Sequence, residues 1–307
     1  MGYSRFDPDD WDTYSTKTAS KPAAAVFKSV GLHEDLDPLK FKVRESRDSV
    51  LNPESTAVIV GFDETGSMGH IPEYFVKTGL GILFQSILDR KPVTDPHLMV
   101  MGIGDAECGD KSPIQVSQFE SDISITNQIE KVHLEHGGGG NGYESYELPW
   151  YIARFRTSID CFEKRNKKGY LFTIGDEPAS KGVIKSQVKK FIGDATERNI
   201  PLKEMYEMVS KMYNTYHIII AEGYYQHSPD EVRDSWLEVM GENAIILTDY
   251  TKLSELITSI IEVNEGRDKA TVTASWSGDT SLVIAKSLAG YGNMTKVADA
   301  GTAVVRF

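Results

Sequence analysis

The chain has few cysteines, no long apolar run and a deficit of basic residues. Its two cysteines, Cys108 and Cys161, form neither a disulfide framework nor a metal-spaced pair, which favours a reducing compartment. No stretch approaches the roughly 20 apolar residues of a membrane-spanning helix. The polar, acidic N-terminus also lacks the apolar segment of a signal peptide. We therefore expect a soluble, cytoplasmic protein with no membrane partner.

The excess of acidic side chains argues against binding to nucleic acid. The chain has 33 Lys and Arg against 45 Asp and Glu, a net charge of −12, whereas a nucleic-acid binder normally presents a basic surface to the phosphates. The densest basic cluster, residues 164–168, precedes an apolar run, and we interpret it as a solvated helix end. At 307 residues, of which 40% are hydrophobic, the chain can form one large domain with appendages or two ordinary domains.

Three segments differ in pattern. Residues 1–54 form a polar N-terminal arm, which is either loosely packed and partly disordered alone or orders on a partner. Residues 55–266 alternate strand-like and helix-like runs. Residues 267–307 predict a β-rich C-terminal tail, because apolar residues alternate over 270–276 and another apolar run covers 301–307. This tail is expected either to pack as a small β appendage on the same domain or to pair with the edge of another chain.

The middle segment predicts an α/β fold. Apolar, β-branched runs indicate buried strands at residues 56–62, 97–103, 170–174, 216–221 and 244–247. Helical periodicity separates them, including a predicted helix over 143–162 with Pro149 as its irregular point. Such alternation builds a Rossmann-like, doubly wound, mostly parallel sheet with helices on both faces.

Oxygen-bearing side chains follow two of these strands. Asp63, Thr65 and Ser67 come directly after the first run, and Asp176 follows the run at 170–174. A glycine-rich loop between them carries Asn141 and Glu144, with Ser145 as a further possibility. Ligand sites in open α/β sheets lie at the carboxyl ends of the strands. Oxygen ligands without thiolate or imidazole suit Mg²⁺, with Mn²⁺ or Ca²⁺ as alternatives.

These residues resemble the metal-ion-dependent adhesion site (MIDAS) of von Willebrand factor A (VWA) domains, and the chain looks like an intracellular bacterial or phage member. The family pattern is Asp-x-Ser-x-Ser after the first strand, a Thr in a middle loop and an Asp after the fourth strand. Asp63-x-Thr65-x-Ser67 and Asp176 match its two ends. No threonine stands in residues 137–145, so the resemblance implies that Asn141 or Glu144 takes that role. The resemblance to VWA domains covers about residues 55–266.

The resemblance implies a non-enzymatic, metal-dependent protein-binding module. Asp63, Thr65 and Ser67 would hold the cation directly or through water, and Asp176 would act through water or behind the direct ligands. A partner protein's Asp or Glu would complete the coordination, although a carboxylate in the middle loop would weaken the attraction of an acidic group. One alternative is a structural or assembly protein, possibly virion-associated, that self-associates through arm or tail. Others are an adaptor of an AAA-type ATPase and a metal-dependent phosphatase.

Other motifs are weaker. Residues 137–142 fit a Gly-x-Gly-x-x-Gly dinucleotide pattern, but the acidic residue expected after the next strand is missing. A phosphotransfer nucleophile at Asp63 would need an Asp where Thr65 stands. His133-x-x-His136 is too isolated for a zinc site. We therefore predict no catalytic or nucleotide-binding residue, and we interpret Glu64, His70 and Glu177 as solvated loop residues.

Overall fold

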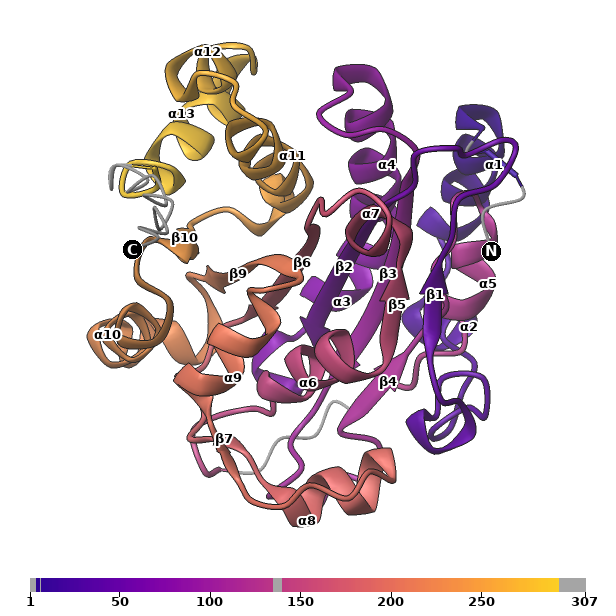
Figure 1. The fold of residues 1–307 in the computed structure, drawn as a ribbon. Helices are drawn as coiled ribbons and strands as arrows, with labels where there is room; N and C mark the ends of the chain where they lie inside the picture. The colour runs from indigo at the N-terminus through magenta and orange to yellow at the C-terminus, as the bar shows by residue number, and fades with distance from the viewer. Residues whose placement is uncertain (1–3, 6, 135–139, 293–307) are drawn as a thin grey trace, which may run out of the picture.

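A single six-stranded sheet forms the centre of the molecule (Figure 1). The computed structural model describes residues 4, 5, 7–134 and 140–292. The strands are β2 (Thr56–Asp63), β3 (Pro96–Ile103), β4 (Ile114–Val116), β6 (Gly169–Gly175), β9 (Tyr213–Ile220) and β10 (Ala244–Leu247). Their order is β10-β9-β6-β2-β3-β4, and only the pair of β3 and β4 in this sheet is antiparallel. Numbered along the chain, the order is 3-2-1-4-5-6, that of a doubly wound sheet. The predicted fold class is confirmed.

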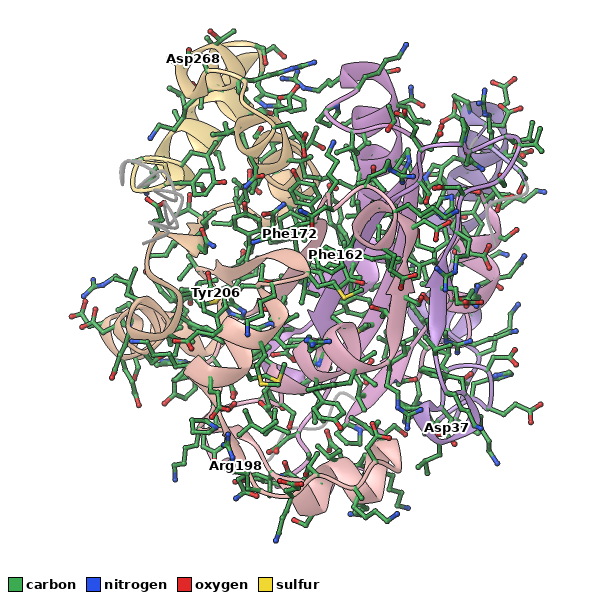
Figure 2. All side chains as sticks on the ribbon, in the orientation of Figure 1. Asp37, Phe162, Phe172, Arg198, Tyr206 and Asp268 are labelled. Carbon is green, nitrogen blue, oxygen red and sulfur yellow. The ribbon has the colours of Figure 1, made fainter. Side chains whose placement is uncertain are left out.

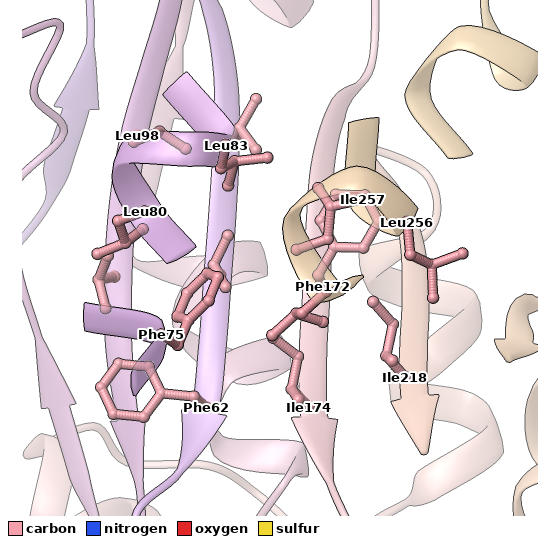
Figure 3. Packing of buried hydrophobic residues seen from close by; sticks show 14 of the residues in the cluster. Phe62, Phe75, Leu80, Leu83, Leu98, Phe172, Ile174, Ile218, Leu256 and Ile257 are labelled. Atoms are coloured by element: carbon pink, nitrogen blue, oxygen red, sulfur yellow. The ribbon is translucent and has the colours of Figure 1, made fainter. Parts of the chain in front are cut away.

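Two hydrophobic cores cover the two faces of the sheet. Along β2, Val58, Val60 and Phe62 face one core, and Ala57 and Ile59 face the other. The first core is closed by α3 (Ile71–Tyr74), a π-helical turn (Phe75–Gly79), α4 (Leu80–Arg90) and α11 (Leu253–Asn264). Figure 3 shows the labelled residues of α4 and α11 packing on this face. The second core lies under α6 (Glu147–Phe155), α9 (Leu202–Val209) and α10 (Pro229–Met240).

The predicted helix over residues 143–162 is interrupted. Its helical part is α6, in which Pro149 falls in the first turn, where no intrahelical N–H bond is lost. The chain then forms β5 (Thr157–Ile159), which pairs with β1 (Arg44–Ser46), and α7 (Asp160–Glu163) follows. The β-branched ends of β5 explain why this stretch extends. The short apolar group at 132–134 forms no strand.

The described part of the N-terminal arm packs on the rest of the chain. It forms α1 (Pro8–Ala19), capped by Asp7, then α2 (Ala23–Val26), a 3-10 turn (Pro38–Lys40) and β1. Trp11 is only 5% exposed and lies against Phe84, with ring centroids 6.2 Å apart. A Cβ on Gly81 would meet the Trp11 ring at 1.5 Å, so α4 needs a glycine where α1 docks.

The prediction of a strand at residues 270–276 is wrong. These residues lie mainly in α12 (Lys269–Ala274), and α13 (Gly278–Ser287) follows. Asp268, labelled in Figure 2, caps α12 by accepting hydrogen bonds from Thr271 N and Oγ1 at 2.8 Å. A short alternation of apolar residues does not distinguish a strand from a helix. The cap at Asp268 stabilises the helix. The other predicted strand, 301–307, lies outside the described residues.

The remaining elements are short. They are β7 (Gly182–Val183), β8 (Ile200–Pro201), α5 (Ser124–Ile129), α8 (Lys185–Gln187), a π-helical turn (Val188–Ile192) and 3-10 turns at Gly66–Met68, Gly223–Gln226, Gly241–Asn243 and Tyr250–Lys252. Within the described ranges, no helix is both long and apolar enough to cross a membrane. The proposed boundaries at 54/55 and 266/267 stay predictions.

Candidate metal centre

The candidate site lies where the winding of the sheet reverses. Asp63 is the last residue of β2, and Asp176 directly follows β6. These two strands are parallel neighbours, with Phe62 opposite Ile174. Connections from β2 and β6 leave toward opposite sides of the sheet, which opens a crevice at their carboxyl ends. The fold therefore brings the two carboxylates to one place from positions more than a hundred residues apart.

Hydrogen bonds and one oxygen–oxygen contact join four of the predicted ligands. Asp63 Oδ1 accepts from Thr65 N at 2.8 Å and from Thr65 Oγ1 at 2.6 Å. Thr65 Oγ1 lies 3.3 Å from Ser67 Oγ, which donates to Asp176 Oδ1 at 3.0 Å. Asp63 and Asp176 are fully buried, whereas Ser67 is exposed. The group is thus anionic at its base and open to solvent at Ser67.

Tyr146 holds the second oxygen of Asp63. Its hydroxyl donates to Asp63 Oδ2 at 2.7 Å, and the side chain is fully buried. A Cβ on Gly175 would lie 2.0 Å from the Tyr146 hydroxyl, so the end of β6 must be a glycine for the tyrosine to reach Asp63. Sequence reasoning missed Tyr146 because it lies just before α6 rather than at the end of a strand.

The loop after β9 closes on the other carboxylate. Tyr224 N donates to Asp176 Oδ2 at 2.6 Å. The preceding Gly223 has φ +54°, and a Cβ there would lie 2.1 Å from Asp176 Oδ2 and 2.7 Å from the Ser67 carbonyl oxygen. Only glycine fits such a conformation at such close approach. The sequence carried no local signal for this contact.

The middle loop does not join the hydrogen-bonded group. Glu144 is 2% exposed, and within the part of the chain that the structure describes its Oε2 has no hydrogen-bond partner. Asn141 has neither side-chain polar atom paired. Ser145 Oγ instead accepts from Ala106 N at 3.0 Å and ties this loop to the loop after β3. The structure thus brings together Asp63, Thr65, Ser67 and Asp176, and leaves Asn141 and Glu144 beside them.

Burial and mutual repulsion raise the pKa values of these carboxyl groups. Burial, reinforced by Asp176, raises the pKa of Asp63 to about 7, and burial also raises the pKa of Asp176. Burial is the larger cause and the charge of Asp63 the next in raising the pKa of Glu144 to about 11. The same two causes raise the pKa of Glu177 to about 8. The charges that raise these values are all carboxylates, so a bound cation would relieve the repulsion.

The donors fit a hard divalent cation. Buried carboxylate oxygens, hydroxyl oxygens and unpaired oxygens on Glu144 and Asn141 are the ligand types that Mg²⁺, Mn²⁺ and Ca²⁺ take. Over the described residues, no three Asp, Glu, His or Cys side chains converge so as to hold a metal by themselves. The hydroxyls of Thr65 and Ser67 must therefore complete such a site.

The flanking residues differ from expectation in one case. Glu64 is 1% exposed, and its Oε1 accepts from Gln115 Nε2 at 2.6 Å, so the prediction of a solvated loop residue is wrong. His70 is exposed and lies 2.7 Å from the Tyr250 hydroxyl. Glu177 is half-buried, and its backbone carbonyl accepts from Trp236 Nε1 at 2.9 Å. The Trp236 ring in turn stacks on His217, with centroids 3.6 Å apart.

Comparisons with known proteins give distant structural neighbours. No family model and no curated protein sequence matches the chain. Proximal thread matrix protein 1 from the mussel byssus aligns at 12% identity and a TM-score of 0.43, over 68% of this chain and 48% of that protein. The pilus adhesin SpaC from Lactobacillus rhamnosus GG aligns at 11% identity and a TM-score of 0.45, over 75% and 31%. A von Willebrand factor type A protein from Catenulispora acidiphila aligns at 13% identity and a TM-score of 0.38, over 70% and 44%.

The chain thus spans less than half the length of these three proteins. The mussel protein is also described with a zinc-occupied MIDAS motif. VWA domains are therefore among the structural neighbours, but the similarity is too low to assign a family or a function. The α/β fold class stands on the strand order given above.

Proposed function

We propose that this chain is a divalent-metal-dependent protein-binding module of the VWA type. Asp63, Thr65 and Ser67 would hold the metal, with Asp176 acting directly or through water. The observation that carries this proposal is the hydrogen-bonded group itself, which links two buried carboxylates through two hydroxyls to an exposed edge. Two buried, adjacent anions without a basic partner need a cation to remain charged together.

The bound metal, of which Mg²⁺ is our first choice, would supply positive charge and an open coordination position at the surface. The protein residues fix where that position lies. Tyr146 and Thr65 orient the Asp63 carboxylate, and Tyr224 N orients Asp176. Because Ser67 is the exposed member, a partner would approach from its side. An Asp or Glu of a partner protein is the group that we expect to bind there.

We further propose that the module is not an enzyme. The hydroxyls near the site bond to carboxylates: Thr65 Oγ1 donates to Asp63, and Ser67 Oγ donates to Asp176. Neither pairs with a histidine in the manner of an activated nucleophile. The histidine buried beneath the site, His217, instead lies 2.9 Å from Thr173 Oγ1.

A second role is favoured by the same hydrogen bonds. They link the loops after β2 and β6, and Tyr224 N adds the loop after β9, without any added ion. The site could therefore serve to tie loops in an assembly protein. In that case self-assembly would proceed unchanged when Asp63 is replaced, and no metal would be required.

Calorimetric titration with Mg²⁺ and Mn²⁺ tests the proposal on the wild type and Asp63→Ala. We expect binding in the wild type and its loss in Asp63→Ala, with cooperative thermal unfolding kept in both. Asp249→Ala is the matched control, because Asp249 Oδ1 accepts from Thr251 N at 3.0 Å and from Thr251 Oγ1 at 2.6 Å in the same local motif. An absence of binding in the wild type would reject the proposal and leave the loop-tying role.

A further inference from the structure

A second group of unpaired oxygens lies beside the candidate metal centre. Asp105, in the loop after β3, is 1% exposed; its Oδ1 accepts from Glu107 N at 2.7 Å, and its Oδ2 has no hydrogen-bond partner among the described residues. Glu144 Oε2 and the side-chain amide of Asn141 are unpaired as well. None of these atoms takes part in the hydrogen-bonded group of Asp63. Buried polar atoms in native proteins nearly always have a partner, so this concentration requires an explanation.

Backbone contacts hold the two loops together at this point. Ser145 N donates to the carbonyl oxygen of Gly104 at 3.1 Å, and Ala106 N donates to Ser145 Oγ at 3.0 Å. Asp105 and Glu144 directly precede the two residues that form this second bond. The Tyr143 hydroxyl adds a further bond between the loops, to Glu107 Oε2 at 2.6 Å. These bonds hold the loop that carries Asp105 against the loop that carries Glu144, and the charge of Asp105 is among those that raise the pKa of Glu144.

The charges around this point are all of one sign. After burial, the groups that raise the pKa of Glu144 are Asp63, Glu177, Asp105 and Asp110, in that order. Asp105 also raises the pKa of Cys108 to about 11. Glu144 thus lies near both Asp63 and Asp105. A cation at Asp63 alone would leave the oxygens of Asp105 and Asn141 without a partner.

We propose that Asp105, Glu144 and Asn141 bind a second cation of the Ca²⁺ class beside the first centre. Two carboxylates and an amide oxygen, all on loops, match the flexible all-oxygen sites that Ca²⁺ occupies, whereas Mg²⁺ demands a stricter octahedron. Glu144 would stand between the two ions. This inference moves Asn141 and Glu144 from the first site to the second, and it does not require that the first site bind metal.

The test is a calorimetric titration of the whole chain with Ca²⁺ in saturating Mg²⁺. We expect the wild type to bind one further ion, and Asp105→Asn to lose that event while keeping Mg²⁺ binding. Asp249→Asn, which removes a carboxylate from a turn outside both proposed sites, is the control and should keep both events. Glu144→Gln gives a second variant should Asp105→Asn unfold, and it too should lose Ca²⁺ binding. Thermal melts of each variant show that the fold is kept.

Three outcomes separate the two proposals. A Ca²⁺ event that persists in Asp105→Asn and Glu144→Gln but disappears in Asp63→Ala would show displacement at one shared site and overturn the second site. Mg²⁺ binding without any Ca²⁺ event would also overturn it, and would leave the proposed function standing. Conversely, a Ca²⁺ event that depends on Asp105 and survives Asp63→Ala, without any Mg²⁺ event, would support the second site and reject the first.

Discussion

Two turns in this molecule are built alike and differ in what surrounds them. Asp63 and Asp249 each accept hydrogen bonds from the backbone N–H and the hydroxyl of a threonine two residues on. Asp249 begins a half-buried 3-10 turn, whereas Asp63 is fully buried, faces Asp176 and accepts a third bond from Tyr146. The local motif is therefore a turn, and burial beside a second carboxylate converts it into a candidate cation site.

Removing the threonine hydroxyl from each turn is expected to have the most unequal effect. Thr65→Val should lower Mg²⁺ affinity by about 10- to 100-fold, because it removes a proposed ligand and the link to Ser67. Thr251→Val should leave Mg²⁺ binding unchanged and cost about 0.5–1.5 kcal/mol of stability, because it removes the hydroxyl bond to Asp249 and keeps the bond from Thr251 N. Calorimetry and denaturant unfolding measure both. Equal metal affinities in the two variants would mean that the turns do not differ in function.

Gly223→Ala tests the loop that closes on Asp176. The added Cβ would meet Asp176 Oδ2 at 2.1 Å, and the residue would keep a φ of +54°. We expect destabilisation by about 1–3 kcal/mol and weaker Mg²⁺ binding, because the loop must move away from the carboxylate. Gly241→Ala is the control: its φ is +57°, and no atom lies within 4 Å of its added Cβ. If both variants lose equal stability and keep Mg²⁺ affinity, the contact with Asp176 has no role.

Tyr146→Phe tests the hydrogen bond that Asp63 accepts and that the turn at Asp249 lacks. The variant keeps the ring and removes the donor to Asp63 Oδ2. We expect Mg²⁺ affinity to fall by roughly 10-fold, the lower end for partners that orient a metal ligand. Calorimetry measures this change, and Tyr143→Phe is the control because the Tyr143 hydroxyl bonds to Glu107 instead. Unchanged affinity in Tyr146→Phe would show that Thr65 alone orients Asp63.

The pH dependence of stability should differ with and without metal. Burial raises the pKa of Asp63 to about 7, above its unfolded value near 4. Between these values the metal-free native state holds more protons than the unfolded chain, so its stability falls as the pH rises from about 4 to about 7. Mg²⁺ binds the ionised form and should reduce this fall.

Melting temperatures recorded across this window, with and without Mg²⁺, measure the effect. Asp63→Asn should reduce the slope of the metal-free curve. Glu144 and Glu177, with their pKa values raised to about 11 and about 8, act in the same direction, so a residual slope is expected in Asp63→Asn. A metal-free stability that rises with pH would contradict the assignment.

The sequence predicted the parts of the fold that depend on long local patterns. The buried strands at 56–62 and 170–174 are continuous apolar runs, and their ends place Asp63 and Asp176 without further information. The prediction of a strand at 270–276 was wrong because a few alternating apolar residues fit both a strand and a helix. The cap at Asp268 favours the helix. The break after Phe155 depends on pairing with β1, a contact between distant segments.

As with the fold, the site residues that follow from local patterns were predicted, and those that depend on distant contacts were not. Asp63, Thr65, Ser67 and Asp176 were found because strand ends converge at one edge of a parallel sheet. Tyr146 and Gly223 were missed because their roles come from packing against residues far away in sequence. Buried Glu64 is paired with Gln115 on the edge strand β4, two strands away from β2, and no local pattern carries that information.

The stacking of His217 on Trp236 gives the protein an optical signal close to Asp176. The Trp236 N–H is bonded to the carbonyl oxygen of Glu177, one residue beyond Asp176, and its ring lies nearly parallel to the imidazole at an angle of 13°. Of the four tryptophans in the chain, Trp236 is the one bonded to this loop. Its emission should respond when the loop shifts, so intrinsic fluorescence would follow ion binding in real time without any attached dye.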